Sequence, residues 1–218
     1  MNVKSVSVKK DILSANRKIA EQIRSRLDKH HVRMVNIMSS PGAGKTSLIT
    51  RTIARFKDLF TIVVIEGDIA SSIDAERISQ LNVRAIQINT GGGCHLDANM
   101  IGKALTDLEL ENLDLVFIEN VGNLVCPAEI ELGAHKNVVI LSVPEGDDKP
   151  YKYPVIFLEG DTVLVNKIDV LPYFDFNLDT FTKTINGMNP SARVIPVSAK
   201  SGEGLDDWYA WIEQVLAS

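Results

Sequence analysis

The amino-acid sequence predicts an α/β domain with a mostly parallel, twisted sheet and helices on both of its faces. Short apolar runs rich in valine and isoleucine recur along the chain, separated by segments with helical periodicity, as in sheets whose crossovers are helices. Several runs end directly in glycine, asparagine or an acidic residue, and such residues meet at the ligand-binding edge of a parallel sheet. The runs are residues 34–38, 60–65, 83–88, 113–118, 137–143, 162–165 and 193–197.

The composition is that of an ordinary globular protein of 218 residues, with 45% hydrophobic and 23% charged residues. The formal net charge of −5 and the pI near 5.4 argue against binding of nucleic acid or of an anionic membrane through bulk electrostatics. No apolar run has the length of a membrane span, and the N-terminus lacks the apolar core of a signal peptide. We therefore expect a cytoplasmic protein.

Residues 10–28 predict an amphipathic helix in front of the first strand. Apolar side chains recur there at steps of three and four, at Ile12, Leu13, Ile19, Ala20, Ile23 and Leu27. The charges between them are too mixed in sign for a basic membrane anchor. We expect residues 1–30 to form a helix that packs on residues 31–218, the main domain, or on a partner chain.

Residues 39–47, Ser-Ser-Pro-Gly-Ala-Gly-Lys-Thr-Ser, join the first apolar run to a helical segment at residues 48–56. A strand that turns through small residues into a helix aims backbone N–H groups at an anion, as in a P-loop. Lys45 would reach the terminal phosphates and the Thr46 hydroxyl would bind Mg²⁺. Ser39 occupies the position of the usual first glycine, which a small residue tolerates if its backbone stays in an allowed region. The expected phosphate-binding residues are Pro41, Gly42, Ala43, Gly44, Lys45, Thr46 and Ser47.

The second run ends in Glu66-Gly67-Asp68, before a short helix expected around residues 74–81. A carboxylate at this position, such as that of Asp68, would hold Mg²⁺ through water or orient the attacking water. Aspartate is also common as a helix cap or in a turn, which is the alternative explanation.

The chain has two cysteines, Cys94 and Cys126, too few for a disulfide framework. Cys94 and His95 follow a glycine-rich turn after the third run, ahead of a helical segment at residues 96–105. Cys126 follows the fourth run and would emerge at the same edge of a parallel sheet. Thiolate and imidazole suit Zn²⁺ or Ni²⁺, although a fourth ligand from water, substrate or a second subunit would be needed. From the residues alone, a core thiol and an ordinary histidine explain the pattern equally well.

The sixth run ends in Asn166-Lys167-Ile168-Asp169. The Asp169 carboxylate can accept from the ring N–H and the amine of guanine, a pair of donors that adenine lacks. The last run ends in Ser198-Ala199-Lys200, whose backbone would contact the guanine carbonyl. The three motifs in this order, each after its own strand, predict GTP binding through Asn166, Lys167, Asp169, Ser198, Ala199 and Lys200.

Two further segments complete the chain. Residues 144–154 combine prolines with a high density of charge and predict a mobile loop, in which Lys149 or Lys152 either meets phosphate or is an ordinary surface lysine. Residues 205–216, with Trp208 and Trp211, predict a closing amphipathic helix.

Four segments together resemble the HypB family, GTPases that assist nickel insertion into [NiFe] hydrogenase. They are Gly93-Cys94-His95, the highly specific block Glu119-Asn120-Val121-Gly122-Asn123-Leu124-Val125-Cys126-Pro127, Glu145-Gly146-Asp147-Asp148-Lys149 and the guanine motif. The resemblance extends over nearly the whole chain. It implies a SIMIBI-class G domain that dimerises with GTP and carries Cys94, His95 and Cys126 at the subunit interface as a Ni²⁺ or Zn²⁺ site.

The resemblance also implies roles for the segment that starts at Glu119, because it stands where most G proteins have Asp-x-x-Gly. Glu119 and Gly122 would lie near Mg²⁺ and the γ-phosphate. The expected catalytic residues are then Lys45, Asp68 and Glu119, and the expected Mg²⁺ ligands Thr46, Asp68 and Glu119. The implied reaction is slow hydrolysis of GTP to GDP, and the implied partners are hydrogenase maturation proteins and the hydrogenase large subunit.

Three alternatives remain beside this interpretation. A urease-type nickel accessory GTPase also pairs cysteine with histidine, but with a proline between them, whereas Cys94 and His95 are adjacent. A metal-binding scaffold would keep the nucleotide only as structure. A regulatory GTPase would need no metal at all.

Overall fold

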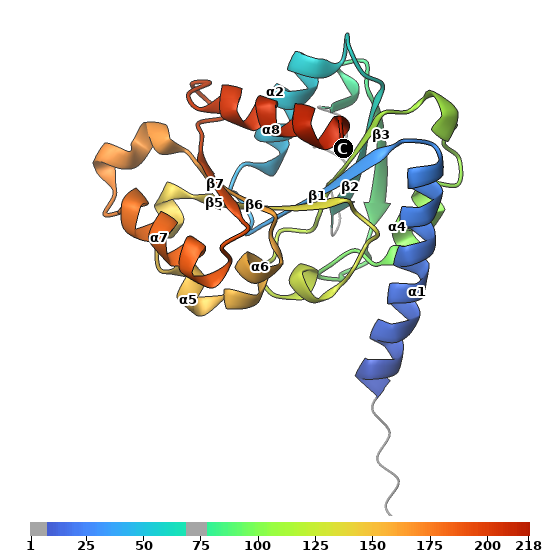
Figure 1. The fold of residues 1–218 in the computed structure, drawn as a ribbon, viewed down its shortest axis with the longest axis horizontal. Coiled ribbons are helices and arrows are strands. Elements are labelled where there is room, and N and C mark those ends of the chain that lie inside the picture. The colour runs from blue at the N-terminus through green and yellow to red at the C-terminus, as the bar shows by residue number, and fades with distance from the viewer. Residues whose placement is uncertain (1–7, 69–77) are drawn as a thin grey trace, which may run out of the picture.

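The fold is a three-layer α/β sandwich, seen in a computed structural model that describes residues 8–68 and 78–218 (Figure 1). Its seven described strands form one sheet in the order β3-β2-β4-β1-β5-β6-β7, and every pairing is parallel. Each predicted apolar run overlaps one strand, so the predicted α/β class is confirmed. The strands are β1 Arg33–Ser39, β2 Ile62–Asp68, β3 Arg84–Asn89, β4 Leu115–Glu119, β5 Lys136–Ser142, β6 Thr162–Asn166 and β7 Arg193–Pro196.

Helices cover both faces of the sheet, as predicted. The described α-helices are α1 Val8–Lys29, α2 Lys45–Phe56, α4 Ala98–Ala104, α5 Lys149–Lys152, α6 Pro154–Glu159, α7 Leu178–Met188 and α8 Leu205–Leu216. The 3₁₀ turns in the described part of the chain are η1 Leu110–Asn112, η2 Cys126–Glu129, η3 Val143–Glu145 and η4 Ile168–Tyr173. Of the short helix predicted around residues 74–81, residues 74–77 lie outside the described residues, and residues 78 and 79 are helical.

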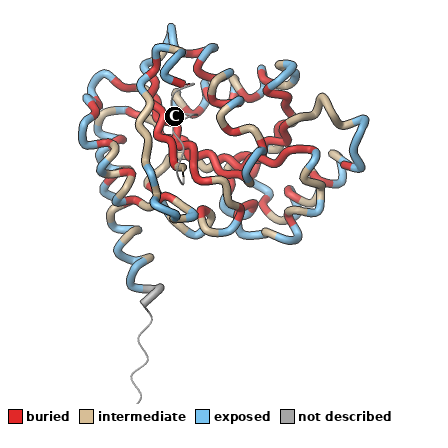
Figure 2. Tube along the Cα trace, turned by 180° about the vertical axis from the view of Figure 1, so that it is seen from behind, coloured by how far each residue is buried: buried red, intermediate tan, exposed pale blue. Residues whose placement is uncertain are grey.

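Side chains alternate along each strand and divide the core between the two faces of the sheet. On β1, Val35 and Ile37 pack with α2 and α8 on one face. Met34 and Met38 point to the other face, where α1 and α4 cover one half and α6 and α7 the other half. Figure 1 shows this arrangement, and Figure 2 shows the buried residues running through the sheet between the helical layers.

The prediction of a loop at residues 144–154 is wrong in part, because η3, α5 and the start of α6 occupy most of this segment. Its prolines occupy the first turns of these helices, where a fixed φ and a missing N–H cost nothing. Glu145 also accepts from the backbone N–H and the hydroxyl of Ser142, which completes a capping box. Prolines that indicated a break in the sequence therefore begin helices in the structure.

The predicted amphipathic helix at residues 10–28 is confirmed as the main part of α1, whose apolar side packs on α4 and the sheet. Asn16 accepts from the first N–H of α4, at Ala98, and donates to the carbonyl of Glu131. The division of the chain at residues 30 and 31 stays a prediction. Among the residues that the structure describes, no helix combines the length and apolar character that crossing a bilayer requires.

The half-buried imidazole of His135 fixes the end of α1 to the sheet. Its Nδ1 accepts from the backbone N–H of Met34 at 2.9 Å, and its Nε2 lies 3.0 Å from a carboxylate oxygen of Asp28. Burial lowers the pKa of His135 below the ordinary value of 6.5 and outweighs the Asp28 carboxylate, which raises it, while the guanidinium groups of Arg24 and Arg33 also lower it. The folded protein therefore holds this ring neutral, with its proton on Nε2.

We expect the lowered pKa of His135 to make folding sensitive to acid. Near pH 6.5 the ring takes up a proton in the unfolded chain but stays neutral in the folded chain. The contribution of this ring to the free energy of unfolding is therefore fully present above that pH and is lost as the pH falls below it. His135→Asn keeps an acceptor for the Met34 N–H but cannot titrate. Urea unfolding at pH 7.5 and pH 5.0 should therefore show a smaller loss of unfolding free energy in this variant than in the wild type.

The matched control is His31→Asn, which replaces an exposed histidine of positive φ by a residue that tolerates that conformation. An equal acid-induced loss of stability in the wild type and in His135→Asn would contradict the role assigned to His135.

Candidate nucleotide and metal sites

The P-loop lies at the carboxyl end of β1 and leads directly into α2. Gly42 and Gly44 have φ of 78° and 104°, a left-handed conformation that favours glycine. The loop faces the ends of β2 and β4 across a cavity of about 470 Å³. A Cβ on Gly122, on the far wall, would come within 3.0 Å of Pro41, so the two backbones are in close contact. This cavity opens at the edge where all the described strands end.

Ser39, in place of the first glycine, keeps an allowed backbone conformation, since it is the last residue of β1 and has no positive φ. Its buried hydroxyl donates to the carbonyl of Ser40 and accepts from Nζ of Lys45 at 3.1 Å. The serine thus gives the lysine an acceptor within the loop. Lys45 lies where an incoming phosphate would compete with this hydroxyl.

Three of the predicted oxygen ligands line the same cavity: Thr46, Asp68 and Glu119. The Thr46 hydroxyl donates to a carboxylate oxygen of Glu119 at 2.7 Å. Glu119 is buried at the end of β4, and Asp68 ends β2, the next strand. A hydroxyl beside carboxylates is a donor set that suits Mg²⁺. Glu66, paired with Glu119 across the two strands, also lines the cavity, although no motif in the sequence singled it out.

The predicted base-binding residues join the loop after β6 to the P-loop. Asn166 donates to the carbonyl of Ala43 at 2.8 Å and accepts from the N–H of Ala199 at 3.1 Å. Lys167, with φ of 65°, donates from Nζ to the carbonyl of Gly42 at 2.7 Å. Asn166 therefore connects all three nucleotide motifs.

Asp169 is held in place by the last motif. One oxygen of its carboxylate accepts from the Ser198 hydroxyl at 2.6 Å. The same hydroxyl accepts from the N–H of Ser201. It therefore both orients the Asp169 carboxylate and stabilises the turn at residues 198–201. Arg51 of α2 secures this turn from outside by donating to the carbonyls of Ala199 and Lys200 at 3.0 and 2.9 Å. Sequence reasoning missed Arg51, because an arginine on the polar side of a helix carries no local signal.

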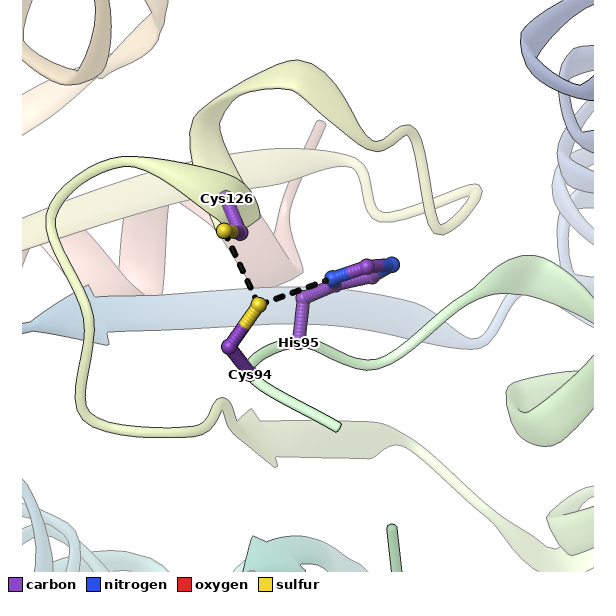
Figure 3. Close-up of side chains that lie close together, drawn as sticks. All are labelled: Cys94, His95 and Cys126. Carbon is purple, nitrogen blue, oxygen red and sulfur yellow. Dashed lines mark hydrogen bonds between the residues drawn. The ribbon is translucent and has the colours of Figure 1, made fainter. Parts of the chain in front are cut away.

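Cys94, His95 and Cys126 converge at this edge of the sheet (Figure 3). Their donor atoms all lie within 4.8 Å of one another, and no other group of three metal-ligating residues is this compact among residues 8–68 and 78–218. The Cys94 sulfur lies 2.9 Å from that of Cys126 and 3.6 Å from Nδ1 of His95. Cys94 is exposed, and Cys126 begins η2.

The hydrogen bond to Cys126 raises the pKa of the Cys94 thiol above its ordinary value. The Cys94 thiol is therefore protonated at neutral pH without metal, and a soft cation would have to displace its proton. Two sulfurs and one nitrogen fit Zn²⁺ or Ni²⁺ with a fourth position left open. This clustering argues against the alternative of two unrelated core thiols.

Comparisons with known proteins show the family to which this chain is related. A family model described as "CobW/HypB/UreG, nucleotide-binding domain" matches residues 33–196. The hydrogenase maturation factor HypB of Rhizobium leguminosarum bv. viciae is 50% identical over 95% of this chain and 70% of its own length.

Two crystal structures share the fold. HypB from Archaeoglobus fulgidus superposes with a TM-score of 0.88 at 37% identity, over 94% of this chain and all of that one. HypB from Helicobacter pylori in complex with nickel superposes with a TM-score of 0.87 at 40% identity, over 93% of this chain and 95% of that one.

We expect Gly44→Ala to disrupt the nucleotide site. The added Cβ would collide with the side-chain amide of Asn166, and φ of 104° strains alanine. The affinity for fluorescent GDP, measured by titration, should fall at least tenfold, and unfolding should cost about 1–2 kcal/mol less.

The matched control is Gly187→Ala in α7, where a Cβ meets open space. It should keep the wild-type affinity for GDP and stabilise the fold by about 0.5–1 kcal/mol. Wild-type GDP affinity in Gly44→Ala would contradict the close packing of the P-loop on Asn166.

Proposed function

The chain belongs to the HypB hydrogenase maturation factors, GTPases of the P-loop class with the CobW/HypB/UreG nucleotide-binding domain, and we propose that it uses GTP to handle nickel during [NiFe]-hydrogenase maturation. One observation carries this proposal: the P-loop cavity and the Cys94–His95–Cys126 group lie at the same edge of one parallel sheet. A bound γ-phosphate can therefore act on both loops that carry the cysteines.

We propose that Pro41, Gly42, Ala43, Gly44 and Ser47 wrap the phosphates while Lys45 exchanges the Ser39 hydroxyl for a terminal phosphate oxygen. The 3.1 Å contact to Ser39 supports this, because a lysine already held inside the loop needs only a short movement. Gly122, against Pro41, would offer its N–H to the γ-phosphate.

Thr46 and Glu119, already 2.7 Å apart, would hold Mg²⁺ directly, with Asp68 reaching it through water. When bound, the ion neutralises charge that develops on the phosphates. Asp68 or Glu119 would orient the attacking water. With no arginine supplied to the transition state, turnover of the isolated chain would be slow.

Nickel would be the cargo, held by the Cys94 and Cys126 thiolates and the His95 imidazole. The solved HypB with nickel, 40% identical to this chain, supports this choice of metal, although the same donors also suit Zn²⁺. The open fourth position would take water or an atom of a second subunit. We propose that the cargo passes from there to the partner protein.

We propose that GTP promotes a homodimer around this group and that hydrolysis reverses the change. The partners would be other hydrogenase maturation proteins and the hydrogenase large subunit. The net charge of −5 supports protein partners over nucleic acid or an anionic membrane. The cytoplasm would be the site of assembly.

We expect Asp169→Asn to change the base that the site prefers. The variant loses the carboxylate that accepts from guanine, and its amide can instead donate to the carbonyl that xanthine carries in place of the amine. GTP affinity should fall by about 100-fold or more, and xanthosine triphosphate should bind more tightly than in the wild type, as measured by competition with fluorescent GDP.

The control for Asp169→Asn is Asp179→Asn, which neutralises an exposed carboxylate in the first turn of α7 and should leave GTP affinity unchanged. Unchanged GTP affinity in Asp169→Asn would refute the assigned base site.

Size-exclusion chromatography with in-line metal analysis tests the coupling of the two sites. Wild-type protein loaded with Ni²⁺ should elute as a dimer with Mg²⁺ and a non-hydrolysable GTP analogue but not with GDP, and its nickel content should differ between the two states. Cys94→Ala should lose the nickel while keeping nucleotide affinity, because its side chain lies outside the P-loop cavity.

The control for Cys94→Ala is His31→Asn, which removes an exposed histidine outside the metal group. Unchanged nickel content in Cys94→Ala would favour a regulatory GTPase without metal. Absence of GTP hydrolysis even with partners would favour a scaffold with a structural nucleotide.

A further inference from the structure

We infer that Asn123 is the positioning residue through which the nucleotide loop and the metal group act on each other. This inference rests on the proposed function and assigns its coupling to one side chain. Asn123 lies between Gly122, at the wall of the nucleotide cavity, and Cys126 of the metal group. Its hydrogen bonds go to backbone groups of both loops, and its side chain also interacts with the Cys94 thiol.

The backbone of Asn123 is tied to the nucleotide loop. Its N–H donates to the carbonyl of Ser39 at 2.7 Å. Ser39 is the residue whose hydroxyl holds Lys45, so a lysine that moves to a phosphate changes the surroundings of the same residue. Gly122, the preceding residue, packs on Pro41 without room for a Cβ, so this segment follows any movement of the P-loop.

The side chain of Asn123 is tied to both cysteine loops. Its amide nitrogen donates to the carbonyl of Cys94 at 3.2 Å, and its amide oxygen accepts from the N–H of Val125, next to Cys126, at 2.9 Å. One planar amide therefore sets the spacing between the backbones that carry the two sulfurs, which lie 2.9 Å apart. A rotation or shift of this amide alters the distance on which metal binding depends.

The segment from Asn120 to Cys126 is held firmly at its start, so Asn123 is the residue at which it can move. Asn120 is buried and donates to Asn36, which in turn donates to Asn137, so a chain of side-chain amides crosses β4, β1 and β5. Asn120 also accepts from the N–H of Leu96, just after His95. Because Asn120 and Asn36 are buried and all three amides are hydrogen-bonded, they form a rigid base. Asn123 is only half-buried and lies where the segment leaves that base.

The test compares nickel affinity in three nucleotide states. Ni²⁺ is titrated into the full chain without nucleotide, with GDP, and with Mg²⁺ and a non-hydrolysable GTP analogue, and binding is followed by the thiolate-to-nickel charge-transfer absorption. The readout is the ratio of dissociation constants between the GDP and analogue states. Any effect of a substitution on metal affinity that is equal in all states cancels in this ratio.

In the wild type we expect the ratio to differ from one by about fivefold or more. In Asn123→Ala, which loses both side-chain contacts, it should fall to within about twofold of one while the charge-transfer band and GDP binding persist. Linkage requires that nickel change the affinity for the analogue by the same factor, so the reverse titration must agree.

Asn123→Asp serves as a second variant if the alanine variant does not fold. It keeps the acceptor for the Val125 N–H and loses the donor to Cys94, so its ratio should lie between those of the wild type and Asn123→Ala. The matched control is Asn89→Ala. Asn89 is exposed and its amide oxygen accepts from the N–H of Gly91, in the glycine-rich turn before Cys94, but its side chain is not bonded to the P-loop. It should keep the wild-type ratio.

The outcomes separate this inference from the proposed function. A wild-type ratio retained in Asn123→Ala overturns the role of Asn123 and leaves the coupled nickel GTPase intact. A wild-type ratio of one, with nickel and GTP both bound, overturns the coupling and the inference with it. A wild type that binds no nickel at these cysteines overturns the proposed function itself.

Discussion

The central place of β1 in a wholly parallel sheet is the constraint on which both sites depend. With β4 on one side and β5 on the other, the carboxyl end of β1 is the point where loops from both halves of the sheet meet. Ser39 ends this strand and serves both sites: its hydroxyl holds Lys45 and its carbonyl accepts from Asn123. Misplacing β1 would separate the phosphate loop from the metal-binding loops.

Hydrogen bonds between loops, more than contacts within each loop, determine the shape of the nucleotide site. Asn166 is hydrogen-bonded to both the P-loop and the turn after β7, and Arg51 hydrogen-bonds that turn to α2. The cavity walls are therefore assembled before a nucleotide enters, which lowers the ordering cost of binding. The metal group differs, because Cys94 is exposed and the amide of Asn123 is one of the contacts that hold its loop. A preassembled nucleotide site beside an exposed metal group is compatible with the proposed release of a metal cargo.

Local sequence signals predicted the elements and motifs that depend on nearest neighbours. The strand runs, α1 and α8 follow from periodicity, and the P-loop follows from glycine and proline spacing between a strand and a helix. Helix α7 was not predicted, and neither were the helices that begin within residues 144–154. Their prolines read as breaks, because the sequence does not show that each lies in the first turn of a helix.

The sequence by itself determined the α/β class, the order of the nucleotide motifs and the types of metal ligand, since each is written in a short contiguous segment. It left the cysteines equally explained as core thiols. Only the tertiary structure decided that Cys94 and Cys126, from loops after β3 and β4, lie 2.9 Å apart, that Asn123 secures the loops around them, and that Arg51 secures the turn after β7. The physical reason is that these contacts join residues far apart in the chain, and their distance is set by strand order and register rather than by any local pattern.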